Sequence, residues 1–583
     1  MMVHVLLPLS LAASLCCSTY ASAAAATVEQ YIARQGPISL DGVLANIGAD
    51  GARAAPLGAL KGVVIASPSS DPPYAYTWTR DSSLVMKMLI DRFVDGRDKT
   101  RLPLIEDWMA SQAKYQNLDS PSGEARDTSL GEPKFEVNET AFTGSWGRPQ
   151  RDGPALRATA FISMANYYID KRNVSYVQQS LWPAIILDLK YLTRRWNQTT
   201  FDLWEETRGS SFFTTATQHR AIQEGIALAE KLHATKDVDL ADWKSQASNI
   251  LCMLQSYWTG GSILANTKSG RSGLDVNTIL ASVHTYSPNA GCDAKTFQPC
   301  SDKALAGHKA VVDSFRGTLY PINANAAANA AVAIGRYKED VYYGGEPWYL
   351  ANFAAAEQLY LALNTWTKSL NLQVTKISQP FFAQFVPGIK TGTYTVISPT
   401  YWKLLSAIRS YADGFVAINQ RYTPTDGSLR EQFNRTDGTP LSAEHLTWSY
   451  ASSLTAFDRR AGRLPPSWPA TGLKVPQVCQ AGPQPPRAAV TFVVNATTEP
   501  GQVIHVTGSV DELQGWSPEN GPELNGDAYP IWTVTLDIAV KTNVEYKYVK
   551  YLNGSVTWES DPNRSFTTPS NEGETLTLND TWR

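Results

Sequence analysis

Two adjacent glutamates beside a tryptophan form the first group of residues that could do acid–base chemistry. They lie in the run Asp202-Leu203-Trp204-Glu205-Glu206. A carboxylic acid that packs against an indole ring loses the hydration of its charged form, so it keeps its proton to higher pH and can protonate a leaving oxygen. Glutamates in this setting are more often part of a solvated helix end, so other stretches must support a catalytic interpretation.

Other stretches place charged residues among aromatic ones near predicted helices. Arg80 and Asp81 come at the start of such a helix, where they could bind two hydroxyl groups of a sugar or simply form a helix cap with an ion pair. Residues 335–348 form a second loop rich in charged and aromatic residues. Glu431 lies in a turn-rich loop between helices, a position that favours a functional role more than usual, although a surface glutamate is the ordinary alternative.

The elements that must position these residues are mostly helical. Residues 155–169, 222–228 and 353–363 have apolar side chains nearly all round the predicted helix. A helix without a polar face must be buried on both sides. Such helices alternate with amphipathic ones and with long loops rich in Gly and Trp. We therefore expect two concentric layers of helices, with the catalytic residues on loops at one rim.

The pattern changes after residue 465. Residues 466–487 are dense in Pro and Gly and read as a short linker. Residues 491–494, 502–510, 531–538, 544–551 and 575–578 are then short runs of β-branched and aromatic residues, as in an all-β sandwich. Trp516, Trp532 and Trp558 could make a platform for sugar rings there, although for one or two of them a place in the core is favoured.

The composition is compatible with a sugar ligand. The 583-residue chain has a net charge of -3, 18% charged and 10% aromatic residues, with 17 Trp and 26 Tyr. Few charges and many aromatic rings suit a neutral, hydroxyl-rich ligand, although a large aromatic core would explain them as well. We expect no nucleic-acid or membrane partner and a monomer. No Cys/His cluster has the spacing of zinc ligands, and we expect no cofactor.

The N-terminus is typical of a secreted protein. An apolar run from Val5 to Cys17 leads to an Ala-x-Ala site ending at Ala23, which predicts a signal peptide over residues 1–23 and an extracellular location. N-glycosylation sequons agree with secretion. They begin at Asn138, Asn173, Asn197, Asn434, Asn495, Asn553, Asn563 and Asn579.

Cysteines of the mature chain also suit an oxidising compartment. Removal of the signal peptide leaves Cys252, Cys292, Cys300 and Cys479, which allow several pairings. The short spacing favours Cys292–Cys300 as a local staple, with Cys252–Cys479 as the second disulfide.

Taken together, these stretches resemble the fungal-type glucoamylases of glycoside hydrolase family 15. The motifs occur in the family's order over nearly the whole mature chain: YTWTRD (76–81), GSWGRPQRDGPALRA (144–158), DLWEE (202–206), SSFFT, QHRA, GRYKED and LTWSYA. The C-terminal region similarly resembles a family 20 starch-binding module through GWS (515–517), EYKYV from residue 545 and WESDPNRSF from residue 558.

The resemblance implies a multidomain fold and a set of site residues. The expected fold is an all-α (α/α)6 barrel over residues 24–465, the linker, and an all-β immunoglobulin-like sandwich over residues 488–583. By resemblance, Glu205 is the general acid and Glu431 the general base. Substrate-binding positions are Tyr74, Arg80, Asp81, Trp146, Asp202, Glu206, Arg336, Tyr342, Trp348 and Trp448. The module's first starch site would comprise Trp516, Glu545, Lys547, Trp558 and Asn563, and Trp532 matches a second site in which Pro500 stands in place of a tyrosine.

The implied activity is that of a secreted, exo-acting glucan 1,4-α-glucosidase. It would release β-D-glucose from the non-reducing ends of starch, amylopectin and maltooligosaccharides by inversion, and would cleave α-1,6 branches more slowly. One alternative is another (α/α)6 glycosidase, acting on dextran or trehalose. A second is a starch-binding lectin that has lost its catalytic activity.

Overall fold

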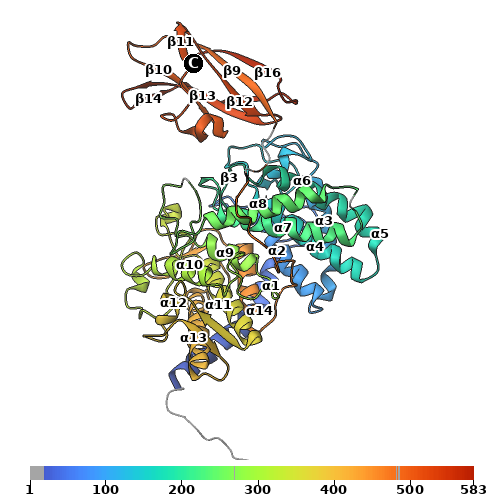
Figure 1. Cartoon of the computed structure of the whole chain (residues 1–583), viewed down its shortest axis with the longest axis vertical. Helices are drawn as coiled ribbons and strands as arrows, with labels where there is room; N and C mark the ends of the chain where they lie inside the picture. Colours follow the sequence, from blue (N-terminus) through green and yellow to red (C-terminus); the bar gives the residue numbers. More distant parts are fainter. Residues whose placement is uncertain (1–18, 235, 268, 481, 483–485) are drawn as a thin grey trace, which may run out of the picture.

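The computed structural model describes residues 19–234, 236–267, 269–480, 482 and 486–583. A helical domain is followed by a smaller strand-rich domain, and the two are stacked along the long axis of the molecule (Figure 1). The predicted signal peptide lies outside the described residues up to residue 18. None of the described helices combines the length and the apolar character that crossing a membrane would require.

Six helices form a closed inner ring. The ring consists of α2 (Thr79–Val94), α4 (Asp152–Asp170), α7 (Phe212–Lys231), α9 (Asn277–His284), α11 (Tyr349–Ser369) and α14 (Thr447–Arg460). Each of these helices contacts the next, and α14 contacts α2 to close the ring. The three segments with apolar side chains all round belong to α4, α7 and α11, so their predicted burial on both sides is confirmed.

Six further helices cover the inner ring. They are α1 (Thr19–Ala45), α3 (Leu102–Tyr115), α6 (Trp182–Arg195), α8 (Leu240–Ser256), α10 (Asp302–Asp313) and α13 (Pro399–Tyr422). These helices are amphipathic: α13, for example, buries Leu404, Leu405 and Ile408 against α11 and leaves Trp402 exposed. The two concentric layers are the (α/α)6 arrangement that the family resemblance implied.

Short hairpins occupy the rim at the N-terminal ends of the inner helices. They are β1 (Thr77–Trp78) with β2 (Lys134–Phe135), β3 (Thr200–Phe201) with β4 (Arg208–Gly209), and β7 (Gln432–Phe433) with β8 (Pro440–Leu441). β1 leads directly into α2, and β4 comes shortly before α7. The hairpins thereby fix the loops that carry the candidate catalytic residues. A separate hairpin, β5 (Asn371–Val374) with β6 (Gly392–Thr395), and the short helices α5 (Val174–Tyr176) and α12 (Gln379–Ala383) complete this domain.

The C-terminal domain is a sandwich of two four-stranded sheets. One sheet has the order β11-β12-β9-β16, and in the other β13 pairs with β10, β14 and β15. The strands are β9 (Arg487–Asn495), β10 (Val503–Gly508), β11 (Asn525–Ala528), β12 (Ile531–Ala539), β13 (Asn543–Leu552), β14 (Ser555–Trp558), β15 (Arg564–Thr567) and β16 (Thr575–Thr581). Alternate residues of β9, such as Val490 and Phe492, point into the shared core. Five of these strands were predicted from the sequence, whereas β11, β14 and β15, which are only four residues long, were not.

The segment between the domains runs along the barrel. Trp468 is buried there and donates its indole N–H to the carbonyl of Thr285, at 3.0 Å. The structure contains both expected disulfides, Cys292–Cys300 and Cys252–Cys479. Since Cys479 lies in this segment and Cys252 in α8, the second disulfide ties the segment to the barrel close to the start of the C-terminal domain.

We expect the ion pair between α4 and α6 to stabilise the barrel only as an intact pair. Arg157 contacts both oxygens of Asp188 at 2.6 and 2.9 Å, with side-chain exposures of 2% and 0%. Arg157→Met would leave the carboxylate buried without its partner and should lower the free energy of unfolding by about 3–5 kcal/mol. The double variant Arg157→Met/Asp188→Leu should recover most of this loss in urea unfolding. Equal losses in both variants would contradict the explanation.

Candidate active site

A pocket of about 460 Å³ opens at the rim where the inner helices begin. It brings together all but one of the barrel residues predicted for the site. They are Tyr74, Arg80, Asp81, Trp146, Glu205, Glu206, Arg336, Tyr342, Trp348, Glu431 and Trp448. The remaining residue, Asp202, is buried behind the wall. Leu203 and Tyr343 also line the pocket, although neither was predicted. Trp204, the indole expected beside the acid, lines the pocket as well, but the indoles that donate to Glu205 are those of Trp78 and Trp146.

Glu205 is presented by a tight turn between β3 and β4. Its backbone has a positive φ of 67°, which is uncommon for a residue with a long side chain. The carboxylate of Asp202 holds this turn, because it accepts hydrogen bonds from the amides of Glu206 at 3.0 Å and Thr207 at 3.1 Å. Burial raises the pKa of Asp202, and the two amide donors oppose that shift. Asp202 therefore shapes the loop that carries Glu205 and does not contact the pocket itself.

Three side chains hold the carboxylate of Glu205. Trp78 donates to Oε1 at 2.6 Å, Gln150 donates to the same oxygen at 2.9 Å, and Trp146 donates to Oε2 at 2.9 Å. The guanidinium of Arg80 lies 3.6 Å from Oε1. Trp78 and Gln150 were missed by the sequence analysis, although both lie inside or next to the motifs that carried the resemblance.

Glu431 lies in a drier part of the pocket wall. It is only 1% exposed, and its Oε2 accepts a hydrogen bond from the hydroxyl of Ser442. Burial raises the pKa of Glu431 to about 7, against the opposing effects of the Ser442 hydroxyl and the Arg336 guanidinium. Ser442 was not predicted, because a single serine in a loop carries no recognisable signal.

Glu206 is held as an anion by neighbouring donors. Burial opposes its charge, but Arg336 lies 2.8 Å from Oε1, Tyr337 donates to Oε2, and Arg271 lies 2.9 Å from Oε2, which together lower the pKa of Glu206. Arg336 also contacts Asp340 at 2.6 Å. Such a charged network can hold fixed acceptors for sugar hydroxyls.

Arg80 and Asp81 begin helix α2 and contact each other at 3.1 Å. Arg80 also donates to Gln150 at 2.8 Å, so it belongs to the network around Glu205. Burial raises the pKa of Asp81 to about 6, while the adjacent Arg80 opposes the shift. Both side chains line the pocket, as they must if they are to bind hydroxyl groups.

Aromatic rings form much of the remaining wall. Trp204 stacks near Trp448 with ring centroids 6.4 Å apart, and it lies 5.6 Å from Trp348. The hydroxyls of Tyr74 and Tyr342 contact each other at 2.7 Å. Behind Trp204, the buried carboxylate of Asp275 accepts the indole N–H at 2.9 Å. The pocket therefore offers rigid apolar faces between charged groups, which suits the C–H faces and hydroxyls of a sugar.

Lys134 lies among four aromatic rings behind Glu205. Its ammonium is 3.3 Å from the ring centroid of Trp146, 4.1 Å from Phe142, 4.3 Å from Tyr76 and 4.8 Å from Trp78. The residue is 1% exposed, and burial lowers its pKa to about 8. Trp146 and Trp78 are also the two indoles that donate to Glu205. Lys134 lies outside every quoted motif, so these contacts could not be predicted from the sequence.

The C-terminal module places most of its predicted starch residues near its surface. Trp558 is 42% exposed, and Asn563 donates to Glu545 at 3.3 Å. Lys547 is buried and contacts Asp561 at 2.5 Å, so it supports the site from below. The second-site prediction for Trp532 is not supported, because this ring is 8% exposed, packs in the sandwich core and donates its N–H to Ala496.

Two glutamates that line one pocket but have different surroundings can act separately as a general acid and a general base. Glu205 has several donors around its carboxylate, whereas Glu431 is deeply buried with a raised pKa. Such a pair can protonate a leaving oxygen and activate a water during hydrolysis of a glycosidic bond.

We expect Ser442→Ala to move the acidic limb of the pH–activity profile to higher pH. Ser442 stabilises the charged form of Glu431, so its loss should raise the pKa of that carboxyl further. A base must be deprotonated to act, and activity would then be lost at a higher pH as the pH falls. The kcat/KM for maltose between pH 3 and 8 measures the shift, and an unchanged acidic limb would contradict the assignment of Glu431.

We expect Lys134→Met to lower kcat for maltose by about tenfold or more, since a desolvated cation–π contact contributes about 2 kcal/mol. The methionine fills the same space without the charge that attracts the Trp78 and Trp146 rings. Lys134→Arg keeps this charge and should retain most of the activity. Circular dichroism would confirm that both variants are folded, and a fully active methionine variant would rule out the positioning role.

Comparisons with known proteins agree with the geometry of both domains. Residues 37–458 match the family described as "Glycosyl hydrolases family 15", and residues 487–578 match the "Starch binding domain" family. Glucoamylase-1 of Schizophyllum commune is 51% identical over 97% of this chain and 97% of its own, and the Neurospora crassa glucoamylase is 44% identical over 96% and 94%. A solved structure, the family 15 glucoamylase from Hypocrea jecorina, has a TM-score of 0.76 and 45% identity and covers 95% of this chain and 100% of its own. The chain therefore belongs to glycoside hydrolase family 15, as a glucoamylase, a glucan 1,4-α-glucosidase, with a starch-binding domain at its C-terminal end.

Proposed function

We propose that the enzyme removes β-D-glucose one unit at a time from the non-reducing ends of starch and maltooligosaccharides, with inversion at the anomeric carbon. The observation that carries this proposal is the presence of Glu205 and Glu431 in one pocket that also holds Arg80, Asp81, Glu206 and Arg336. A pocket of about 460 Å³ suits a chain end, which supports exo action.

Glu205 is the proposed general acid. It protonates the glycosidic oxygen, and the bond between this oxygen and the anomeric carbon breaks as the aglycone leaves. The donors on Glu205 fix the direction of its carboxyl group, and Asp202 fixes the turn that carries it.

Glu431 is the proposed general base. It takes a proton from a water molecule, whose oxygen attacks the anomeric carbon from the face opposite the leaving group. Burial and the raised pKa make Glu431 a stronger base than an exposed glutamate, and Ser442 orients its carboxylate. The product is glucose of inverted configuration.

The remaining pocket residues are proposed to bind the terminal glucose. Glu206 and Arg336 form one charged group, and Arg80 and Asp81 form another. The aromatic residues Tyr74, Trp146, Tyr342, Trp348 and Trp448 enclose the ring. Cleavage of α-1,6 branches in the same pocket is expected to be slower, because the branched aglycone must approach Glu205 from a different direction.

Other features concern the whole protein. We propose that it is secreted as a monomer after cleavage near residue 23, with a catalytic domain to residue 465, a linker to residue 487 and a starch-binding module beyond it. The disulfides support an oxidising compartment. The partly exposed Trp516 and Trp558 support starch binding at the first site of the module.

Proton NMR of the early products tests the mechanism. With maltoheptaose as substrate, we expect β-glucose to appear first and α-glucose only as mutarotation proceeds. Glu431→Gln should abolish turnover and still bind granular starch, because the module is unchanged. Early α-glucose would overturn the inverting mechanism, internal cleavage products would overturn exo action, and an active Glu431→Gln variant would remove this residue from the base role.

A further inference from the structure

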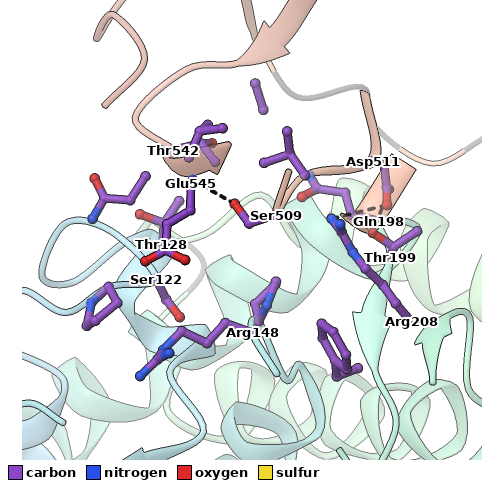
Figure 2. Close-up of a pocket in the computed structure, with 18 of the residues that line it drawn as sticks. Ser122, Thr128, Arg148, Gln198, Thr199, Arg208, Ser509, Asp511, Thr542 and Glu545 are labelled. Atoms are coloured by element: carbon purple, nitrogen blue, oxygen red, sulfur yellow. Dashed lines mark hydrogen bonds and ion pairs between the residues drawn. The ribbon is translucent and has the colours of Figure 1, made fainter. Parts of the chain in front are cut away.

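A second and larger cavity lies between the barrel and the starch-binding module. Its volume is about 810 Å³, compared with about 460 Å³ for the catalytic pocket. Figure 2 shows side chains of both domains around it, with Ser122, Thr128 and Arg148 from the barrel below and Ser509, Thr542 and Glu545 from the module above. Cavities of this size enclose drug-sized ligands and could hold several linked sugar rings.

The two cavities meet at Glu205. Trp146, Gly147 and Glu205 line both of them. Arg80, Asp81, Glu206 and Arg336, the proposed ligands of the terminal glucose, line only the catalytic pocket. The interdomain cavity therefore adjoins the acid side of the catalytic pocket, with these three residues between them.

The chemistry of the reaction indicates which part of the substrate lies on this side. A general acid must contact the oxygen that joins the terminal glucose to the rest of the chain. The rest of the chain must consequently leave the catalytic pocket past Glu205. The interdomain cavity lies on this side of the catalytic pocket.

Two sets of contacts fix the module above the barrel. Asp511 of the module contacts Arg208 at 3.1 Å and accepts a hydrogen bond from Thr199 at 2.5 Å, and these residues lie together on one side of the cavity in Figure 2. Away from this cluster, Lys541 contacts Glu124 at 3.0 Å and Asn543 donates to the carbonyl of Ser120 at 3.2 Å. Because two separate clusters connect the domains, the gap between them has a defined shape.

The walls suit a neutral, hydroxyl-rich chain. Many lining groups are hydroxyls or amides, such as Ser122, Gln198 and Thr542. Arginine and carboxylate side chains add further donors and acceptors for sugar hydroxyls, and the rings of Trp146 and Trp516 add apolar faces. Trp516 and Glu545 also belong to the predicted first starch site, which places that site at the far wall of the same cavity.

We propose that the interdomain cavity binds the leaving part of an α-1,4-glucan, so that one chain runs from Trp516 of the module, past Trp146, to Glu205. The module then does more than attach the enzyme to starch granules, because it forms the upper wall of the substrate path. This inference rests on the proposed role of Glu205 as the general acid.

Obstruction of the cavity from either wall tests the proposal. Ser565 of β15 and Thr143 of the barrel both line the cavity and are exposed, and the described structure shows no side-chain hydrogen bond for either. Ser565→Arg and Thr143→Arg therefore fill the space without breaking a side-chain hydrogen bond. Because Ser565→Arg also removes the sequon that begins at Asn563, all enzymes are compared after their glycans have been trimmed. The matched controls are Thr577→Arg on β16 and Thr393→Arg on β6, which are exposed positions that do not line this cavity.

The measured quantity is the ratio of kcat/KM for maltoheptaose to kcat/KM for maltose. Each enzyme is first trimmed with an endoglycosidase, because Asn197 of a sequon also lines the cavity. We expect Ser565→Arg and Thr143→Arg to lower this ratio by about fivefold or more, since the lost contacts lie remote from the reacting bond, while activity on maltose is retained. Both control variants should keep the wild-type ratio.

Three results would overturn the proposal. They are a wild-type ratio in both cavity variants, a loss in only one of them, or an equal loss in the controls, since a chain in the cavity must touch both walls and nothing at the control positions. Failure of the proposed function is a separate result, because it would appear in the wild-type enzyme as absent glucose release from maltose or as early α-glucose from maltoheptaose.

Discussion

The catalytic pocket depends on how it offsets the cost of removing carboxylates from water. Each buried acid must either be stabilised by nearby donors or keep its proton to higher pH. Glu206 obtains it from two guanidinium groups and a tyrosine hydroxyl, and its pKa falls. Burial outweighs the Ser442 hydroxyl and the Arg336 guanidinium at Glu431, and its pKa rises to about 7. Glu205 is held by two indole N–H groups and an amide. Three glutamates in a single cavity therefore differ in the groups that hold their carboxylates.

The double ring of helices makes this arrangement possible. Every inner helix begins at the same rim, so the positive ends of several helix dipoles point toward one acidic site. Asp81 and Asp152 lie in the first turns of α2 and α4 and contact Arg80 from two sides. Because the apolar inner helices are fully enclosed by the outer ring, the rim cannot shift without disturbing the core. The loops that carry Glu205 and Glu431 are therefore held on a rigid base.

The sequence predicted what depends on local pattern or on long motifs. Apolar helices such as α11 and the longer strands follow from side-chain periodicity, and the resemblance supplied the pairing of Glu205 with Glu431, which are far apart in the chain. Lys134 could not be found in this way, because its role comes from four rings that tertiary folding gathers around it. Trp532 was misread for the opposite reason, since an aromatic residue in a strand does not reveal whether it faces the core or a ligand.

The proposed path of the glucan between the domains could not be predicted from the sequence either, because it depends on how two folded domains meet. A flexible linker would leave a starch-binding module free to sample many positions, and its effect would be only to raise the local concentration of substrate. Here the disulfide Cys252–Cys479 fixes the connecting segment. Separate ion pairs made by Asp511 and Lys541 hold the module against the barrel. A module held in this way can contribute surface to the substrate path itself. Binding energy gained on a distant part of the glucan is then available at Glu205, where the bond breaks.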